Sequence, residues 1–358
     1  MRVGFDVTAL LAGTTGVARY VHELATALEQ QGIELRRFAI GRGSHGAEVG
    51  ADGVRRIPIP LRVVHLSWAL VREPSAERLA PGCDVVHTPD LVPPPTRRPL
   101  VLTVHDLAAV ERPELHPRRA VQIQRRQLAV ARDRADVVMS DSHATADALR
   151  SRGVDGDRIV VAPNGVTAFP AADASMVPDD PYLLAVGALT PRKNLEGLVA
   201  AFARASLPDG LRLVLAGPPG WGAHTVLAAI ERHRVSDRVI RTGSVTDAQL
   251  AGLYQGCLAV CVPSRAEGFG LPVIEAGAAG APVLASDLAV FREVGEGVAL
   301  HVPPADEQAW AAALERIVTD EDLRREAAAR GRSFARRFTW ERTAAITASA
   351  YERAREAA

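Results

Sequence analysis

The strongest constraint on the fold is an alternation of short apolar runs with longer amphipathic stretches, which starts afresh near residue 182. The alternation is typical of parallel α/β sheets, and the near-continuous apolar character of the runs indicates sheets covered by helices on both faces. The predicted strands are 2–7, 33–40, 84–88, 99–104, 136–140 and 158–162 in the first half, and 182–187, 211–216, 238–242, 258–263, 282–286 and 298–302 in the second.

The amphipathic stretches between these runs predict helices near 17–31, 65–79, 117–135 and 142–152, and then near 194–206, 222–235, 246–255, 271–280 and 306–318. The tail from 320 to 356 reads as helical throughout. A chain of 358 residues exceeds one ordinary core, and a Pro/Ala/Asp-rich stretch before Pro181 is the best linker. We therefore predict domains at 1–165 and 180–335, followed by a terminal helix at 336–358. The sequence leaves open whether that helix packs back on the first domain.

Composition narrows the class of protein. The 42 basic side chains are balanced by 42 acidic ones, so a nucleic-acid binder relying on a global positive field is not expected. No apolar run approaches the roughly 20 residues that span a bilayer, and the first residues do not resemble a signal peptide. Cys83, Cys257 and Cys261 are too few for a disulfide framework, and the last two read as buried thiols. These features favour a cytoplasmic location.

Lys193 is the one lysine among the 42 basic residues, and it stands beside Arg192 in the loop after the predicted strand 182–187. Asn194 is predicted to cap the helix that follows. Two cations beside a helix N-terminus suit a diphosphate, since the helix dipole adds positive charge there. The alternative is an ordinary solvated pair of basic side chains.

The segment after the predicted strand 258–263 is the most informative one. Glu267 precedes a turn of Gly268, Phe269, Gly270 and Leu271, whose backbone N–H groups suit an anion. Pro272 fits the first turn of the following helix, and we expect Glu275 within that same turn. Two carboxylates flanking an anion-receptive turn suit a ligand with hydroxyls at both ends and phosphates between. The alternatives are a helix-dipole charge at Glu275 and a solvated loop acid at Glu267.

The first half offers two weaker candidates. Gly16 ends the loop that begins at Gly13 and opens a predicted helix, where glycine permits close approach of a phosphate or sugar. His105 follows the predicted strand 99–104 and can contact a substrate hydroxyl or act as an acid or base. Each reading has a structural alternative: a helix-entry turn for Gly16 and a capped histidine for His105.

The stretch Glu267-Gly268-Phe269-Gly270-Leu271-Pro272-Val273-Ile274-Glu275 resembles the E-x7-E signature of retaining family 4 glycosyltransferases. Gly187 with Arg192-Lys193-Asn194 is similar to the diphosphate motif of that family. Other segments follow the family order: Gly13–Gly16, Thr103–Asp106, Pro163–Val166 and Gly280–Val283. The resemblance covers nearly the whole chain and implies the GT-B fold, two Rossmann-like doubly wound parallel-sheet domains facing across a cleft.

The resemblance also implies roles for individual residues. Arg192 and Lys193 would neutralise a leaving diphosphate, and Glu275 would hold the ribose hydroxyls. Glu267 and the backbone from Gly268 to Leu271 would contact sugar hydroxyls and phosphates. His105 would contact the donor sugar near the reacting centre, and Gly16 would lie near the phosphates.

Neither a metal nor another cofactor is expected. The acidic pairs Asp155/Asp157 and Asp320/Asp322 have the residue types and spacing of a metal-chelating D-x-D motif but not its structural context, and we interpret them as turn and cap residues.

Residues 112–134 hold seven arginines and two acids, and read as a basic amphipathic helix. Such a helix docks on anionic lipid or is simply solvent-exposed, and the sequence leaves both readings open.

The leading hypothesis is therefore a retaining hexosyltransferase acting on a nucleotide-sugar donor and a saccharide or lipid-linked acceptor. By analogy with bacterial relatives, mannose from GDP-mannose is the first candidate for the donor, in the synthesis of a polysaccharide or glycolipid precursor. A UDP-sugar is the close alternative. A nucleotide-sugar 2-epimerase or hydrolase and a non-catalytic sugar-nucleotide-binding protein are the alternatives from other classes.

Overall fold

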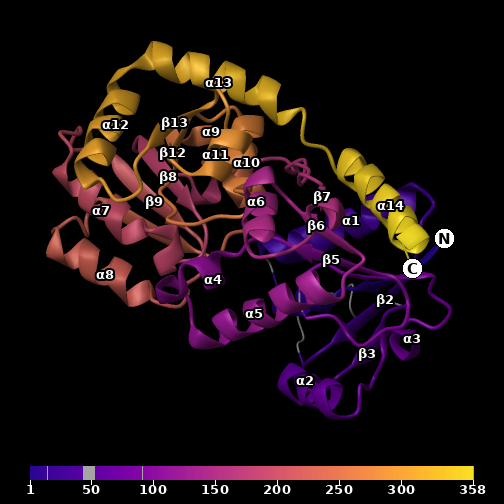
Figure 1. Cartoon of the computed structure of the whole chain (residues 1–358). Helices are drawn as coiled ribbons and strands as arrows, with labels where there is room; N and C mark the ends of the chain where they lie inside the picture. The colour runs from indigo at the N-terminus through magenta and orange to yellow at the C-terminus, as the bar shows by residue number, and fades with distance from the viewer. Residues whose placement is uncertain (14, 43–52, 91, 358) are drawn as a thin grey trace. The chain divides into compact units, whose positions relative to one another are not determined.

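The computed structural model describes residues 1–13, 15–42, 53–90 and 92–357 (Figure 1). These residues form two compact units, each built on its own sheet. The first unit comprises Met1–Val110, Arg119–Gly165 and Thr339–Ala358, and the second comprises Glu111–Arg118 and Val166–Phe338. The chain therefore leaves the first unit twice, briefly at Glu111–Arg118 and then from Val166 to Phe338, and returns to it for the last time at Thr339.

The sheet of the first unit is parallel throughout, in the order β3-β2-β1-β4-β5-β6-β7. Its strands are β1 (Arg2–Asp6), β2 (Glu34–Ile40), β3 (Arg55–Ile57), β4 (Val85–Thr88), β5 (Leu100–Val104), β6 (Val137–Ser140) and β7 (Ile159–Val161). The helices are α1 (Gly16–Gln30), α2 (Leu61–Leu70), α3 (Ala76–Leu79), α4 (Ala108–Glu111), α5 (Arg118–Asp133), α6 (His143–Ser151) and α14 (Trp340–Ala357).

The sheet of the second unit is also parallel, in the order β10-β9-β8-β11-β12-β13. Its strands are β8 (Tyr182–Val186), β9 (Arg212–Ala216), β10 (Val239–Gly243), β11 (Ala259–Val262), β12 (Val283–Ser286) and β13 (Ala299–Val302). The helices are α7 (Leu195–Arg204), α8 (Ala223–Arg232), α9 (Asp247–Gly256), α10 (Leu271–Ala279), α11 (Ala289–Val294), α12 (Glu307–Thr319) and α13 (Glu321–Ala335).

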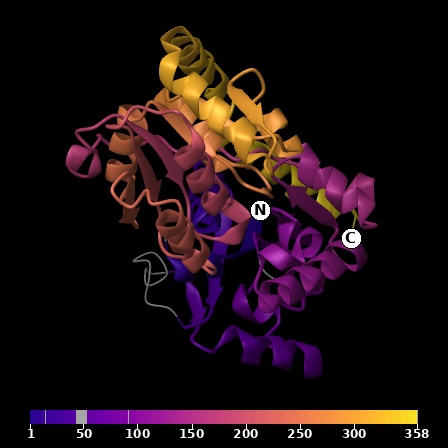
Figure 2. The same ribbon diagram turned by 90° about the vertical axis from the view of Figure 1, so that its left-hand side faces the viewer.

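Helices cover both faces of each sheet (Figure 2), as the near-continuous apolar strands predict. Every residue of β4, β5 and β6 is buried, and so is every residue of β11 and β12. Burial on both faces leaves no polar side of the strand, which explains why no period-two pattern is visible in the sequence. The prediction of two doubly wound parallel-sheet domains is confirmed.

The terminal helix α14 belongs to the first unit. Its Tyr351 ring is fully buried, and the hydroxyl lies 2.7 Å from Nδ1 of His87 on β4. At the start of the helix, the hydroxyl of Thr343 donates to the carbonyl oxygen of Pro163 at 2.6 Å. Trp340 is also buried, and its ring packs edge-on against that of Tyr20 on α1.

Several predicted elements were wrong in detail. The stretch 65–79 is two helices, α2 and α3, because Pro74 has no N–H to donate and disfavours helical geometry at the residue before it. The tail is also two helices, with a break between Ala335 and Trp340 where the chain passes from the second unit to the first. Three short elements were not predicted from the sequence: β3, α4 and α11. They are only three, four and six residues long.

Candidate functional site

The two most specific sequence motifs meet in the second unit because their strands are neighbours. β8 leads into a short 3-10 helix, Pro191–Lys193, and β11 leads into the loop before α10. β8 and β11 pair in parallel, so their carboxyl ends lie at the same edge of the sheet. The backbone N–H of Arg265 donates to the carbonyl oxygen of Arg192 at 2.8 Å, which joins the two loops directly.

Glu267 is the centre of an ion-pair cluster at this edge. One carboxylate oxygen, Oε1, accepts a hydrogen bond from Nζ of Lys193 at 2.6 Å and another from the hydroxyl of Ser264 at 2.8 Å. The other, Oε2, lies 2.6 Å from Arg192, whose guanidinium also donates to the carbonyl oxygen of Ala266 at 2.9 Å. The Glu267 side chain is only 8% exposed, so the alternative of a solvated loop acid is wrong.

The charges of this cluster set its protonation. Burial alone would raise the pKa of Glu267, but Arg192 and Lys193, with the hydrogen bonds from Lys193 and Ser264, outweigh it and hold the pKa at about 2. Burial lowers the pKa of Lys193, and Arg192 lowers it further, while Glu267 opposes both. With Glu267 ionised and both cations charged, the cluster carries one net positive charge, which suits an incoming phosphate.

Gly187 and Asn194 shape the loop that carries the cations. Gly187 has φ +136°, and a Cβ there would lie 3.1 Å from Cε of Lys193. The aliphatic part of the lysine side chain therefore packs directly against the backbone of Gly187. The expected side-chain cap at Asn194 is wrong. Asn194 stands at the N-cap position with φ +52°, but its side chain makes no cap bond. Its amide instead donates to the carbonyl oxygen of Pro304 at 3.0 Å, so it holds the loop to a neighbouring segment.

The loop from Gly268 to Leu271 turns directly into α10. Gly270 precedes the helix with φ +96°, and a Cβ there would lie 2.5 Å from the ring of Phe291. Phe269 is buried with its ring against Phe338, while Pro272 occupies the first turn of the helix as predicted. Leu271 begins the helix, so the backbone from Gly268 to Leu271 runs up to the N-terminus of α10.

Glu275 lies beyond the first turn of α10, which contains no acid, so the expected position within that turn was wrong. The helix begins only at Leu271, because Gly270 still has left-handed geometry. The Glu275 side chain is buried and accepts a hydrogen bond from the hydroxyl of Tyr254 on α9 at 3.0 Å. A buried carboxylate held in this way is fixed in position more firmly than a surface charge at a helix end.

The first unit carries a second group of polar side chains at the carboxyl edge of its sheet. His105 follows β5, and its Nδ1 lies 2.7 Å from a carboxylate oxygen of Asp141, which follows β6. The imidazole packs edge-on to the ring of Tyr20 on α1, with ring centroids 4.6 Å apart. Gly16 begins α1, and Thr15 before it caps the helix by accepting from the N–H of Ala18 at 3.1 Å. Thr14, within the predicted Gly13–Gly16 loop, lies outside the described residues.

Sequence reasoning missed three acids at this edge, each at or just beyond the end of a strand: Asp6, Asp90 and Asp141. Burial, as the leading cause, raises the pKa of Asp6 to about 6. Burial also raises the pKa of Asp90, while His105 lowers it. The available signal was position, because residues directly after parallel strands line the edge where ligands of such sheets bind.

The acidic pairs outside these motifs have structural partners. Asp155 accepts from the N–H of Asp157, and Asp320 caps α13 by accepting from the N–H of Leu323. Their interpretation as turn and cap residues is confirmed. Within the described ranges, no group of three or more His, Cys, Asp or Glu side chains is placed to hold a metal ion.

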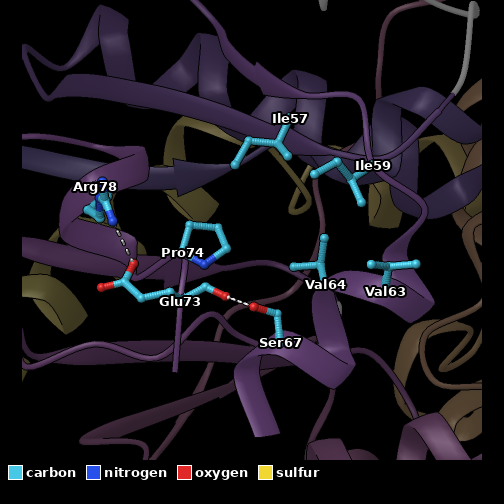
Figure 3. A pocket seen from close by; sticks show the side chains of 8 residues that line it. All are labelled: Ile57, Ile59, Val63, Val64, Ser67, Glu73, Pro74 and Arg78. Atoms are coloured by element: carbon cyan, nitrogen blue, oxygen red, sulfur yellow. Dashed lines mark hydrogen bonds and ion pairs between the residues drawn. The ribbon is translucent and has the colours of Figure 1, made fainter. Parts of the chain in front are cut away.

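A hollow of about 390 Å³ lies elsewhere in the first unit, beside α2 (Figure 3). Its lining is largely apolar, with one ion pair between Arg78 and Glu73 at 3.6 Å: Ile57, Ile59, Val63, Val64, Ser67, Glu73, Pro74 and Arg78. Because its one cation is already paired, this hollow is a poor binding site for a diphosphate.

Comparison with known proteins assigns the family. Residues 172–334 match the family model described as "Glycosyl transferases group 1", and residues 14–168 match "Glycosyltransferase Family 4". The chain is 30% identical to the D-inositol 3-phosphate glycosyltransferase of Xylanimonas cellulosilytica, over 95% of this chain and 92% of that protein. The chain belongs to glycosyltransferase family 4. This glycosyltransferase is also 29% identical to O-antigen chain mannosyltransferase B of Escherichia coli, over 75% of this chain and 74% of that one.

Solved structures agree on the fold of the glycosyltransferase. Sucrose-phosphate synthase from Thermosynechococcus elongatus superposes with a TM-score of 0.80 at 24% identity, covering 100% of both chains. Anabaena HepE, in complex with UDP and glucose, gives a TM-score of 0.74 at 19% identity, covering 98% of each chain. The GT-B fold and the activity of a hexosyltransferase, both predicted from the sequence, are confirmed.

Proposed function

We propose that this glycosyltransferase moves a hexose from a nucleotide-sugar to a saccharide or lipid-linked acceptor with retention of anomeric configuration, and that mannose from GDP-mannose is the first donor to test. The observation that carries the proposal is the cluster of Arg192 and Lys193 around the buried Glu267. The likeness to an O-antigen chain mannosyltransferase supports mannose.

The chemistry of transfer requires charge neutralisation at the leaving group. The bond between the anomeric carbon and a phosphate oxygen breaks, and an acceptor hydroxyl oxygen bonds to that carbon on the same face. The acceptor proton ends on the departing nucleoside diphosphate. Arg192 and Lys193 stabilise the charge that develops on the diphosphate, and their fixed positions reduce reorganisation during the reaction.

In this proposal, the remaining predicted site residues contact different parts of the donor. Glu275 accepts hydrogen bonds from ribose hydroxyls, since its carboxylate is already held in place by Tyr254. Glu267 and the backbone from Gly268 to Leu271 hold sugar hydroxyls and phosphate oxygens. In the first unit, Gly16 lies near the phosphates and His105 contacts the donor sugar.

A UDP-sugar is the second candidate donor, and the solved complexes of HepE with UDP and with UDP-glucose favour it. A nucleotide-sugar 2-epimerase or hydrolase is the alternative reaction. It differs from a transferase in consuming the donor without an acceptor. Both alternatives use the same diphosphate cluster, so the donor screen must be followed by an acceptor test.

The donor screen measures thermal unfolding of the whole chain with GDP, UDP, ADP and dTDP and their common sugar conjugates. A ligand at 100 times its Kd stabilises the folded state by about 2.7 kcal/mol. The proposal predicts a shift with one nucleoside diphosphate, and transfer of its sugar in the α configuration from an α-linked donor, measured by NMR of the product. Stabilisation by none of them, or donor loss without acceptor, contradicts it.

Metal independence is part of the same proposal, because Arg192 and Lys193 already supply the positive charge that a divalent ion would provide. Turnover with the identified donor is expected to be unchanged by excess EDTA. A loss of turnover that Mg²⁺ or Mn²⁺ restores would contradict it.

We also propose that the protein contacts anionic membrane through residues 112–134 and the neighbouring α2. The apolar side of α5 is turned inward, with Val121 and Ala131 buried, so α5 itself offers arginines but little apolar surface. Most of the strongly exposed large apolar side chains among the described residues lie on or beside α2: Ile59, Val63, Leu66, Leu70 and Val71. Burial lowers the pKa of His65 on α2, and the nearby charges of Arg126 and Arg119 on α5 lower it further, which indicates that the two helices lie close together.

A sedimentation assay with phosphatidylglycerol vesicles tests this contact. Leu70→Ser and the charge reversal Arg126→Glu should each weaken binding, and so should high salt, because apolar and electrostatic attraction act together. Trp221→Ser, at an exposed apolar position of the second unit, is the control and should bind like wild type. Equal sedimentation with phosphatidylcholine vesicles, or salt-insensitive binding, contradicts the proposal.

None of the helices in the described ranges is long and apolar enough to cross a bilayer.

A further inference from the structure

The feature that the proposed function leaves unexplained is the carboxylate behind His105. Asp141 follows β6, and its side chain is only 4% exposed. Its Oδ2 faces Nδ1 of His105 at 2.7 Å and also accepts from the side-chain amide of Asn164 at 3.3 Å. Its Oδ1 is buried and has no hydrogen-bond partner among the described residues. A buried carboxylate with an unsatisfied oxygen costs stability, so its retention calls for a role.

The surroundings fix the imidazole in one orientation. The ring of Tyr20 packs against it at an interplanar angle of 83°, and the Tyr20 hydroxyl lies 3.3 Å from the hydroxyl of Thr103 on β5. The hydroxyl of Thr145 donates to the backbone carbonyl of His105 at 3.3 Å. With Nδ1 directed at Asp141, Nε2 is the nitrogen left for a ligand. Nε2 is itself buried, and in the part of the chain that the structure describes it has no hydrogen-bond partner.

We propose that Asp141 is a positioning residue for sugar transfer: it holds Nδ1 of His105 so that Nε2–H points at the donor as a hydrogen-bond donor. The inference rests on the proposed function, because it assumes that His105 touches the donor sugar. It adds a residue that lies outside the motifs of the sequence analysis. A carboxylate that orients a reacting imidazole in this way fixes the direction of its ring.

The local charges keep that imidazole protonated. Burial alone would lower the pKa of His105, but the charge and hydrogen bond of Asp141, followed by the charges of Asp90 and Asp106, raise it to about 9. His87 on β4 also faces the group, but burial holds its pKa at about 3, so it adds no positive charge. At neutral pH Nε2 therefore carries a proton to donate.

Asp141→Asn tests the inference, because asparagine keeps the shape and removes the charge. NMR of histidine-labelled full-length protein, with the His105 signal assigned from His105→Gln, gives the titration directly. The pKa of His105 should fall by about 1–3 when the opposite charge is lost. Asp147→Asn is the matched control: it removes the same charge from an exposed site on the next helix, where Asp147 pairs with Arg150 at 2.6 Å. It should leave the His105 titration unchanged.

Turnover supplies the second readout. In Asp141→Asn, kcat should fall about 10- to 150-fold, the effect expected when a hydrogen bond to a charged group is lost. Affinity for the nucleoside diphosphate should stay near that of wild type, since the diphosphate cluster is untouched. The alkaline limb of the pH–rate profile should move to lower pH with the pKa of His105. A purely structural role predicts lower stability without that movement.

The outcomes separate this inference from the proposed function. If wild type transfers no sugar, the proposed function fails. In that case the titration still tests whether Asp141 controls the His105 ring. An unshifted titration in Asp141→Asn overturns the inference, and so does wild-type kcat in a variant whose titration has shifted. If Asp141→Asn does not fold, Asp141→Glu is used, which keeps the carboxylate. A kcat and a pH profile like those of wild type then support positioning by the carboxylate.

Discussion

Lys193→Met is the sharpest test of the diphosphate cluster, because methionine keeps an unbranched side chain of similar length and removes the ammonium group with its charge and hydrogen-bond donors. Nζ of Lys193 lies 2.6 Å from Oε1 of Glu267, and the lysine side chain is 13% exposed. A diphosphate bound here gains a charge-assisted hydrogen bond from this ammonium. Losing a hydrogen bond to a charged group costs about 1.5–3 kcal/mol. The Kd of the nucleoside diphosphate should therefore rise about 10- to 150-fold.

The cost to folding should be smaller than for an isolated buried pair. Breaking such a pair costs about 3–5 kcal/mol when one charge is left alone. Glu267 keeps Arg192 at 2.6 Å and the Ser264 hydroxyl at 2.8 Å, so its charge stays compensated. The Lys193→Met protein should therefore fold, and its binding defect can be measured by calorimetry on folded protein.

Two further variants control this experiment. Arg265→Met removes a cation from the same region, but Arg265 pairs with Glu196 at 3.1 Å and is 38% exposed, so binding should change little. Lys193→Arg keeps the charge, but its guanidinium is bulkier than the ammonium that packs over Gly187, so it should restore binding only in part. Wild-type affinity in folded Lys193→Met, or equal loss in Arg265→Met, would refute the assignment of the cluster to the diphosphate.

Three further predictions follow from the second unit. Glu275→Gln should lower the affinity for a nucleoside diphosphate but leave the affinity of competing inorganic pyrophosphate unchanged, because the lost contact is to ribose. Calorimetry measures both affinities. Glu267 has a folded pKa of about 2, below its ordinary 4.5, so its charge stabilises the fold above pH 4.5 and that stabilisation disappears as the pH falls toward 2. In urea unfolding at neutral pH, the free energy of unfolding of wild type should exceed that of Glu267→Gln by about 3 kcal/mol. This difference should disappear in acid, where Glu267 is protonated. Gly187→Ala should cost about 1–3 kcal/mol and weaken diphosphate binding, because alanine is strained at φ +136°. Gly210→Ala, with open space around the added methyl, should cost much less.

The sequence predicted the fold well because the constraint was global. Each buried parallel strand leaves an apolar run, and the restart of the alternation marks a second sheet. The errors fell where local patterns were weak or where packing decided the outcome. β3 is a three-residue edge strand with two arginines, which has no apolar signature. The break between α13 and α14 depends on α14 packing in the other unit, and no proline or glycine between Ala335 and Trp340 announces it.

The site was predicted in part for a related reason. Arg192, Lys193 and Glu267 are each visible as residues after a strand, but their contact depends on the pairing of β8 with β11, which the local sequence does not encode. Asp141 was missed because a single acid after a strand looks like an ordinary turn residue. Its burial against His105 appears only once β5 and β6 lie side by side.

The acid within the cation cluster fits a site built for a transient ligand. Without Glu267, Arg192 and Lys193 would repel each other and turn toward solvent before the donor arrives. Glu267 holds both cations in one geometry, at distances of 2.6 Å, and leaves one net positive charge for the diphosphate. A buried ion pair of this kind adds little to stability compared with apolar packing. Its advantage is preorganisation: the cations are already placed when the leaving group develops charge, so the reaction need not move them.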